Sequence, residues 1–298
     1  MLSGIIKPEY LYRPSQLLAR LTSRKKTGHT VVRLPWGSDI CVSANDNVGG
    51  QIVALGLYDL VITETLWRLC DVGESALDVG ANIGYTTFVM AERLGPGSIQ
   101  CFEPHPIIHQ ELIKNIHSLQ DQGSKTQFRT CQFALGPVAG KLPLFVPKDF
   151  EYHRGESSLT APQHLECSSE QFLVEVVTLD SRLQAGESIG VMKLDVEGFE
   201  LEVLKGAEKS FNEKTIRDCV FEEHELYPTP VTNWFESKGY EVFRLDRSFW
   251  GPQLLPGNSL RPRTNWTATN FLATADPQRV RQRFAASGWQ CLRGKSAS

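Results

Sequence analysis

Residues 75–86 read Ser-Ala-Leu-Asp-Val-Gly-Ala-Asn-Ile-Gly-Tyr-Thr, a short apolar run that ends in glycines and is followed at once by a helix-like pattern. This order predicts a strand that turns sharply into a helix. The first N–H groups of a helix lack partners within it and lie at its positive end, so the turn suits an anionic ligand group. A purely structural strand-to-helix turn, found in many α/β proteins, would show the same sequence pattern without binding a ligand.

Strand-like and helix-like segments alternate beyond this turn, which indicates an α/β fold with an open parallel sheet and helices on both faces. A polar stretch at 148–171 is read as an inserted loop, and loops of this length are usually functional or disordered. A Pro- and Gly-rich loop is expected before the last strand. Strands are expected at 76–79, 98–103, 127–133, 141–146, 172–178, 191–194, 218–222, 240–245 and 268–273, and helices at 85–93, 107–119, 199–206 and 231–238.

The chain is expected to divide into an N-terminal helix and hairpin extension (1–57), a main domain (58–276) and a C-terminal helix and tail (277–298). The extension could act as a lid or a dimer element. Its elements are predicted from apolar spacing and turn residues: an amphipathic helix at 14–21, a hairpin at 30–42, a loop at 45–50 and a helix at 56–70.

Composition limits the functional classes. The 298 residues are 41% hydrophobic and 22% charged with a net charge of −3, which describes an ordinary globular protein and argues against nucleic-acid binding. The 7 cysteines are scattered without metal-binding spacing, which favours reduced thiols in the cytoplasm. Neither a signal peptide nor a transmembrane segment is expected.

Glu103 strengthens the ligand-binding interpretation of the first turn. In nucleotide-binding α/β folds an acid at the end of the second strand, about 20 residues past the first glycines, accepts hydrogen bonds from ribose hydroxyls. The Gly-x-Gly-x-x-Gly spacing that admits a pyrophosphate is missing between Gly80 and Gly84. S-adenosylmethionine (SAM) is therefore the expected cofactor, with an NAD-dependent oxidoreductase as the rival interpretation.

Residues 77–85 and Phe102-Glu103-Pro104 resemble the first two motifs of the FkbM family of SAM-dependent methyltransferases. The resemblance continues in Val-Thr-Leu-Asp at 177–180, in Met-Lys-Leu-Asp-Val-Glu-Gly-Phe-Glu at 192–200 and in Phe-Glu-Glu-His at 221–224, and covers fragments of residues 58–273. It implies a class I, Rossmann-like methyltransferase fold in the main domain. The sheet would then be seven-stranded and mainly parallel, with an antiparallel last strand.

The resemblance also implies a cofactor site around the glycine turn. The turn would face the methionine part of SAM, Glu103 the ribose, and Phe102 or Pro104 the adenine. A hydroxyl in the first helical turn, such as that of Thr86, serves equally well as a backbone partner. The expected cofactor-binding residues are Asp78, Gly80, Asn82, Gly84, Tyr85, Thr86, Phe102, Glu103, Pro104, Gln132, Phe133, Ala134 and Asp195.

Methyl transfer needs the acceptor in line behind the methyl group, away from water, and a hydroxyl acceptor benefits from a base. Asp195 and Glu222 follow buried strands at the edge where parallel sheets bind ligands. His224 is a candidate base with an unperturbed pKa near neutrality, and equally a surface histidine. These three are the expected catalytic residues. They could alternatively bind a divalent metal, but no metal is expected.

Two charged neighbours have structural interpretations: Glu200 would favour a helix start, and Lys193 would pair with an acid. The inserted loop is expected to form an acceptor lid together with the N-terminal segment, or else to be a disordered insertion. The expected acceptor-binding residues are Tyr152, His153, Ser157, Ser158, Glu197 and Glu223.

The predicted function is O-methylation of a hydroxyl on a sugar, glycolipid or natural product. Carboxyl acceptors, such as a peptide C-terminus, and nitrogen acceptors remain alternatives, as does a non-catalytic SAM-binding protein. The expected partners are a small-molecule, sugar or peptide acceptor and, as a further option, a second copy in a homodimer.

Overall fold

The computed structural model describes residues 8–9, 28–160, 167–184, 186–225, 227–259 and 268–293, without the side chains of 167–170. The helix expected at 14–21 lies outside these residues. Two short 3-10 helices, Leu179–Ser181 and Gln290–Leu292, accompany the main elements. No helix in the described ranges is both long and apolar enough to cross a membrane.

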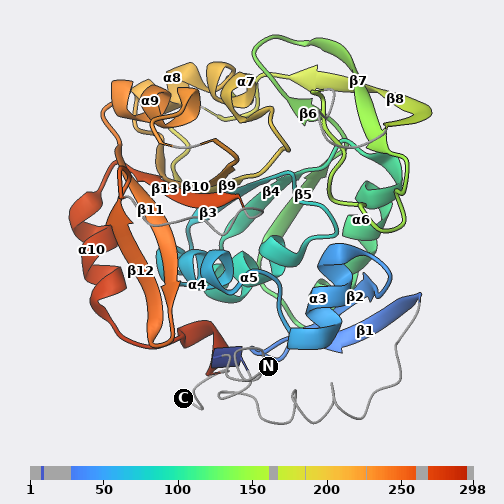
Figure 1. Cartoon of the computed structure of the whole chain (residues 1–298), viewed down its shortest axis with the longest axis horizontal. Coiled ribbons are helices and arrows are strands. Elements are labelled where there is room, and N and C mark those ends of the chain that lie inside the picture. Colours follow the sequence, from blue (N-terminus) through green and yellow to red (C-terminus); the bar gives the residue numbers. More distant parts are fainter. Residues whose placement is uncertain are drawn as a thin grey trace.

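The largest element is an eight-stranded sheet in the order β12-β11-β13-β10-β9-β3-β4-β5 (Figure 1). The neighbours β5, β4, β3, β9 and β10 pair in parallel, and β13 runs antiparallel between β10 and β11. The strands are β3 (Ser75–Val79), β4 (Ser98–Phe102), β5 (Gln127–Cys131), β9 (Ile189–Leu194), β10 (Ile216–Glu223), β11 (Glu241–Ser248), β12 (Gly251–Pro256) and β13 (Thr269–Thr274).

The sheet confirms the predicted class I arrangement with an antiparallel last strand, but it has one strand more than the seven expected. The extra strand is β12, which forms where a Pro- and Gly-rich loop was predicted. Pro252 and Pro256 are tolerated there because β12 is an edge strand, so the missing proline N–H groups are not needed by a second neighbour.

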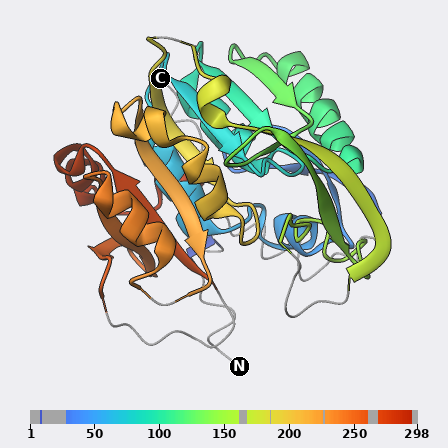
Figure 2. The same ribbon diagram turned by 90° about the horizontal axis from the view of Figure 1, so that it is seen from above.

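Helices cover both faces of the sheet, as the two views at right angles show (Figures 1 and 2). Each face has its own apolar core, and every residue of the central strand β9 is buried between them. One face carries α4 (Leu60–Leu69), α5 (Tyr85–Leu94), α6 (Pro106–Asp121) and α10 (Pro277–Ala285), and the other carries α7 (Glu200–Lys205), α8 (Glu208–Asn212) and α9 (Pro230–Ser237).

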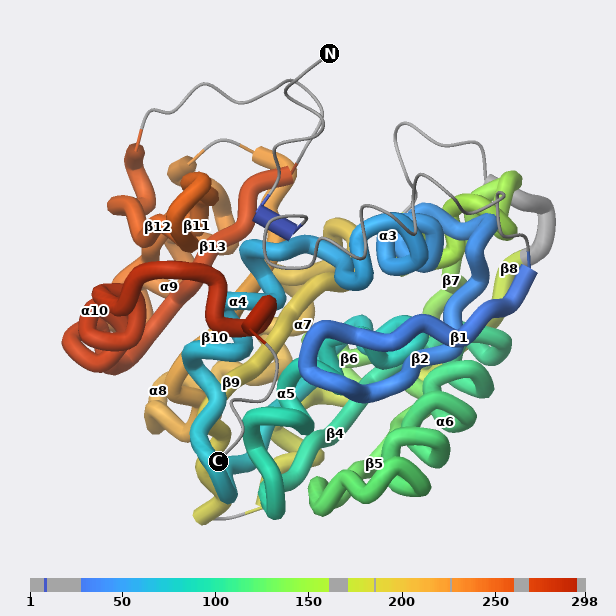
Figure 3. The backbone as a smooth tube through the Cα atoms, turned by 90° about the horizontal axis from the view of Figure 1, so that it is seen from below, coloured from blue at the N-terminus to red at the C-terminus, as the bar shows by residue number. Residues whose placement is uncertain are grey.

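The N-terminal hairpin expected at 30–42 is present as β1 (His29–Arg33) and β2 (Asp39–Ser43). It packs beside α6 (Figure 3), where the Asn115 amide bonds both the N–H and the carbonyl of Cys41. Its Trp36 ring lies 5.6 Å from that of Trp67 on α4. The hairpin therefore shares the core of the main sheet.

The prediction of a loop at 45–50 is wrong, because α3 (Asn47–Leu55) begins there. Asp46 caps this helix by accepting from the N–H of Gly49 at 3.1 Å. Glycine disfavours helices, so the two consecutive glycines at 49 and 50 made this stretch look like a loop in the sequence. Gly49 is required by contact: a Cβ there would lie 2.0 Å from the Ser43 carbonyl oxygen.

A second sheet of three strands projects from the side of β5 and α6 (Figure 2). It consists of β6 (Ala134–Leu135), β7 (Gly140–Pro147) and β8 (Cys167–Val177). The loop predicted at 148–171 is therefore too long, since β8 already begins at Cys167. Within the loop, the backbone of Ser158 pairs with that of Phe145 at 2.8 and 3.1 Å, so residues 148–160 fold back onto β7.

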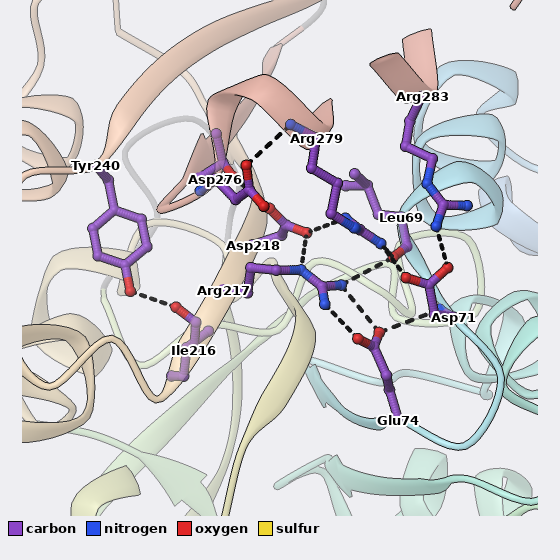
Figure 4. A network of polar contacts seen from close by, with 11 residues as sticks. Leu69, Asp71, Glu74, Ile216, Arg217, Asp218, Tyr240, Asp276, Arg279 and Arg283 are labelled. Atoms are coloured by element: carbon purple, nitrogen blue, oxygen red, sulfur yellow. Dashed lines mark hydrogen bonds and ion pairs between the residues drawn. The ribbon is translucent and has the colours of Figure 1, made fainter. Parts of the chain in front are cut away.

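The amino ends of the central strands carry a network of charged side chains (Figure 4). Arg217, at the start of β10, binds Glu74 and donates to Asp218 at 2.9 Å. Arg279 of α10 donates to Asp218 at 3.0 Å and to Asp71 at 2.7 Å. The network joins α10 to the sheet.

Candidate functional site

A cavity of about 1030 Å³ lies at the opposite, carboxyl end of the parallel strands. Residues just after β3, β4, β9 and β10 line it, together with the start of α4 and part of loop 148–160. Ligands of open parallel sheets bind at this edge. The cavity therefore joins the glycine turn, the acid after the second strand and the acids at the carboxyl ends of β9 and β10.

The glycine turn touches the end of β9. Gly80 has a φ of +75°, and a Cβ on it would lie 1.8 Å from the Asp195 carbonyl oxygen. Asp195 in turn donates its N–H to the Val79 carbonyl at 3.1 Å. Only glycine fits at position 80, because both the backbone conformation and the close approach exclude a side chain.

Glu103 lines the cavity and holds the glycine turn in place. Its two carboxylate oxygens accept from the N–H groups of Asn82 and His105, each at 2.9 Å. Burial raises the pKa of Glu103 to about 7, while these two hydrogen bonds and the charge of Lys193 oppose the rise. Each oxygen keeps a second lone pair that a ligand hydroxyl could use.

Asp78 does not line the cavity, which differs from the expected contact with the cofactor. Its fully buried carboxylate accepts from the hydroxyls of Thr86 at 2.9 Å and Thr87 at 2.6 Å. It anchors the first turn of α5 to β3. Although Thr86 lines the cavity, its hydroxyl is engaged by Asp78. Gly84 also lies outside the lining and begins α5 without a side-chain cap.

Lys193 forms the ion pair expected of it. Its Nζ lies 3.3 Å from Asp195 Oδ2 and 3.9 Å from Asp78 Oδ1, and it donates to the Gly80 carbonyl at 2.6 Å. Burial acts to lower the pKa of Lys193, but the charges of Asp195 and Asp78 outweigh it and raise the pKa. The ammonium group thus links the turn to the end of β9.

Four acids converge on one part of the cavity, and we call Asp59, Asp195, Glu197 and Glu222 the carboxylate cluster. Burial, followed by repulsion from Asp195, raises the pKa of Glu222 to about 8 and that of Glu197 to about 9. Burial and these four acids also raise the pKa of Tyr58, which keeps its phenol protonated. Glu197 and Glu222 therefore hold protons near neutral pH.

Asp59 is the best-anchored member of the cluster. One oxygen caps α4 by accepting from Val61 and Ile62 at 2.9 and 3.0 Å, and the other accepts from the Asn270 amide at 3.0 Å. Asn270 stands opposite Glu222 across β13 and β10. Its carbonyl oxygen is buried and has no hydrogen-bond partner among the described residues.

Loop 148–160 supplies part of the wall. Ser158 lies outside the lining, but its hydroxyl donates to the Glu197 carbonyl at 2.6 Å and so ties the loop to the end of β9. His153 pairs with Glu156 at 2.7 Å. The Ser157 hydroxyl lines the cavity, is buried, and has no partner in the described part of the chain.

Glu200 takes the structural role expected of it. Its carboxylate accepts from the N–H groups of Val196 at 3.0 Å and Gly198 at 3.2 Å, just before α7. Burial raises the pKa of Glu200 to about 7 against these bonds. His224 is exposed at the rim of the cavity, beyond the end of β10.

Most of the predicted residues line the cavity, and six do not. Tyr152 and Gln132 are exposed outside it. Those that line it are Gly80, Asn82, Tyr85, Thr86, Phe102, Glu103, Pro104, Phe133, Ala134, His153, Ser157, Asp195, Glu197, Glu222 and His224. Those outside it are Asp78, Gly84, Gln132, Tyr152, Ser158 and Glu223.

Sequence reasoning missed Tyr58, Asp59 and Asn270. Asp59 carried a detectable signal, an acid directly before an apolar helical run, which is a typical N-cap pattern. Nothing in the sequence placed Asn270 beside it. Among the described residues, no group of three or more His, Cys, Asp or Glu side chains is arranged to hold a metal ion.

A protein family and a relative of known sequence, both described as methyltransferases, match this chain. Residues 78–242, more than half of the chain, match the family described as the methyltransferase FkbM domain. The chain is 29% identical over 234 residues to the methyltransferase sdnD of Sordaria araneosa, which covers 68% of this chain and 87% of that protein.

Among solved structures, the chain is similar to a methyltransferase FkbM from Methylobacillus flagellatus, at 17% identity and a TM-score of 0.43 over 67% of this chain and 43% of that one. It is also similar to a Pyrococcus abyssi tRNA (uracil-54, C5)-methyltransferase in complex with S-adenosyl-L-homocysteine, at 14% identity and a TM-score of 0.40 over 83% and 44%. It spans less than half the length of either of these two chains.

Proposed function

The chain belongs to the FkbM family of methyltransferases, and on that premise we propose that it binds SAM and methylates a hydroxyl oxygen. The observation that supports this most is the continuity of one cavity. It runs from the Gly80 turn and Glu103, which suit the cofactor, to Asp195 and Glu222, which suit a proton-losing acceptor.

The residues present fit the cofactor. Ligand pockets have volumes of roughly 300–1,000 Å³, so a cavity of about 1030 Å³ has room for SAM and an acceptor. Glu103 has free lone pairs for ribose hydroxyls. The rings of Phe102 and Phe133 lie 5.8 Å apart in the wall and would flank an adenine. The unpartnered Ser157 hydroxyl offers one more polar contact.

SAM, when bound, supplies an electrophilic methyl group on a sulfonium sulfur. The chain would contribute three things. The turn and Glu103 orient the cofactor, and loop 148–160 helps to exclude water. A carboxylate oxygen of Glu222, or of its neighbours Asp195 and Glu197, takes the acceptor's proton. Sugar, glycolipid and natural-product hydroxyls all fit this scheme. A carboxylate acceptor fits less well, because the carboxylate cluster would repel it.

The lid role of the loop expected at 148–171, together with the N-terminal segment, stays a prediction, as does a dimer role for the N-terminal extension. Residues 58–276 are proposed as the methyltransferase domain. The hairpin at its N-terminal side packs into the same core, so it would be retained in any fragment made for study.

Calorimetric titration of the full chain with SAM, S-adenosylhomocysteine (SAH) and NAD tests the proposal. We expect SAM and SAH to bind and NAD not to bind. Binding of NAD alone would show the function to be wrong and support the oxidoreductase alternative. Binding of SAM without turnover of any hydroxyl acceptor would support a non-catalytic SAM-binding protein.

Glu103→Ala is expected to weaken SAM binding by about 1–3 kcal/mol, because it removes a hydrogen-bonding carboxylate. The matched control is Glu202→Ala, which removes an exposed carboxylate paired with Lys205 on α7, outside the cavity. Since Glu103 also holds the N–H groups of Asn82 and His105, thermal unfolding of both variants should accompany the titration. Unchanged affinity in Glu103→Ala would remove Glu103 from the site.

A further inference from the structure

We propose that the carboxylate cluster exchanges one proton in step with the charge of the cofactor. The cluster gives up a proton when positively charged SAM binds, and it takes the acceptor's hydroxyl proton as the cofactor becomes neutral SAH. This inference rests on the proposed function, since it requires SAM in the cavity.

The geometry brings the cluster together from three elements. Asp59 comes from the start of α4, and Asp195 and Glu197 follow β9. Leu194 and Phe221 are register partners on the parallel strands β9 and β10, so the next residues, Asp195 and Glu222, also lie side by side. All four carboxylates line the same cavity as the glycine turn.

Among the described residues, the negative charges of the cluster meet few positive charges. Lys193 is already engaged by Asp195, Asp78 and the Gly80 carbonyl. Among the described residues, the carboxylates of Glu197 and Glu222 form no hydrogen bond or ion pair. Both side chains are partly buried. A carboxyl group that is partly removed from water and has no partner favours its neutral form, so these two groups hold their protons in the absence of a cation.

Other charged and titratable groups face Glu197 and Glu222 from each element around them. Burial, together with the four carboxyl groups among them, favours the protonated state and raises the pKa values of Glu197 and Glu222 to about 9 and 8. A cation placed among them would reverse this preference and lower both pKa values. The groups that line the cavity around Glu197 and Glu222 are Lys193 in β9, Asp195 after it, Tyr58 and Asp59 at α4, Glu156 in the loop, His224 after β10 and Arg244 on β11, and Glu200 on α7 acts on both from outside the lining.

The proposed step balances in atoms and charge. A lone pair of the acceptor oxygen forms the bond to the methyl carbon, and the carbon–sulfur electron pair remains on sulfur. The hydroxyl proton passes to a carboxylate oxygen of Glu197 or Glu222. The cofactor loses one positive charge while the cluster loses one negative charge, so the net charge of the partly buried site does not change during the step, and no uncompensated charge is created there.

Calorimetry of the full chain at pH 7.5, in two buffers with different ionisation enthalpies, counts the protons released on binding. We expect SAM to release on the order of one proton and SAH close to none. Between pH 7 and 8 the affinity for SAM should rise by up to about tenfold, as one linked proton requires, and that for SAH should stay nearly constant. SAM and SAH share the amino and carboxylate groups of their methionine part, so the difference isolates the sulfonium charge.

Equal proton release and equal pH dependence for the two ligands would overturn the inference while leaving the proposed function intact. Failure of both ligands to bind would instead refute the proposed function. The comparison uses the unaltered chain, so it decides the question even if a variant fails to fold.

Glu197→Gln and Glu222→Gln locate the proton. Glutamine keeps the shape of a protonated glutamate but cannot release a proton. The variant at the group that gives up the proton should therefore release at most half as many protons as the unaltered chain on binding SAM. The matched control is Glu202→Gln, whose carboxylate pairs with Lys205 at 2.6 Å outside the cavity and should leave the proton count unchanged. Full proton release in both cavity variants would place the exchange elsewhere.

Discussion

Both ends of strand β10 carry acidic side chains, but the charges around these side chains differ between the two ends. At its amino end, Arg217 and Asp218 belong to a network in which each carboxylate meets at least one arginine (Figure 4). At its carboxyl end, Glu222 belongs to the carboxylate cluster, where acids mainly face other acids. One strand therefore joins a region of matched charge to a region of unmatched charge.

The pKa values of Asp71 and Glu222 record this difference, although burial raises the pKa of the fully buried Asp218 against its bonds to Thr274, Arg217 and Arg279. Burial acts to raise the pKa of Asp71 at the amino end, but the hydrogen bonds and charges of Arg279 and Arg283 outweigh it and hold the pKa below its usual value. At the carboxyl end, burial and Asp195 act in the same direction and raise the pKa of Glu222 to about 8.

The comparison suggests what each region contributes. Matched charges fasten α10 and the end of α4 to the sheet, which is a stabilising role. Unmatched, buried acids cost stability, and strongly perturbed acids in a cavity are typical of functional sites. The fold would thus use one end of the sheet for stability and the other for chemistry.

The largest expected effect is on stability at the amino end. Arg217→Met should lower the free energy of unfolding by about 3 kcal/mol, because it leaves Glu74 without its arginine and the fully buried Asp218 with Arg279 as its one remaining arginine partner among the described residues. Urea unfolding monitored by circular dichroism would measure it.

The same substitution at an exposed pair provides the control. Arg33→Met breaks a contact with Asp39 at 3.0 Å in which the two side chains are 67% and 36% exposed, so a change of less than about 1 kcal/mol is expected. Similar losses in the two variants would remove the distinction between the network and an ordinary surface pair.

The next effect has the opposite sign and comes from the carboxyl end. Glu197 has a raised pKa of about 9 in the folded protein, against an ordinary value of 4.5. The folded state therefore binds more protons than the unfolded state between these values, and the contribution of Glu197 to stability falls as pH rises through this window. Glu197→Gln should raise the free energy of unfolding at pH 9 by on the order of 1–3 kcal/mol and change it little at pH 5.

Urea unfolding at both pH values measures this difference. Asp71→Asn is the contrasting variant, because its lowered pKa contributes stability above its ordinary range and loses it as the solution becomes acidic. The free energy of unfolding of Asp71→Asn should be clearly lower than that of the unaltered chain at neutral pH, and the difference should become smaller toward pH 3. A Glu197→Gln variant that is less stable at pH 9 would mean that the cluster is matched by groups outside it.

The sequence predicted the regions where one local pattern determines the structure. The glycine turn, the acid after β4 and the buried strand β9 were all placed correctly, because glycine conformations and apolar runs act over a few residues. The same reasoning missed α3, whose glycines look like a loop, and β12, whose prolines are permitted only by its edge position.

Within the site, contacts across the chain were beyond the reach of sequence patterns. Asp78 lies in the glycine motif, yet its carboxylate accepts hydrogen bonds from the hydroxyls of Thr86 and Thr87. No rule based on residue spacing predicts this contact. The pairing of Asp59 with Asn270 joins residues 211 positions apart. Such pairs depend on how elements pack, so they require the structure.

The smallest effect concerns His224, the candidate base that lies at the boundary of the unmatched region. It is exposed at the cavity rim beyond the end of β10, whereas Glu222 lies within the cluster. A base contributes about 10²–10⁴-fold when it is positioned at the reacting proton. Solvent at the rim makes such positioning unfavourable, so His224→Ala should lower the rate by less than about tenfold.

Initial rates of SAH formation at pH 7 and 8, with any hydroxyl acceptor that the unaltered chain methylates, would test this expectation. SAM affinity measured in parallel separates an effect on chemistry from one on binding. A loss of a hundredfold or more with unchanged SAM affinity would place the base at the rim, on a histidine. The carboxylate cluster would then balance the positive charge of the cofactor, while His224 accepted the acceptor's proton. The two functions that we assign to the cluster would belong to two different groups at the carboxyl end of β10.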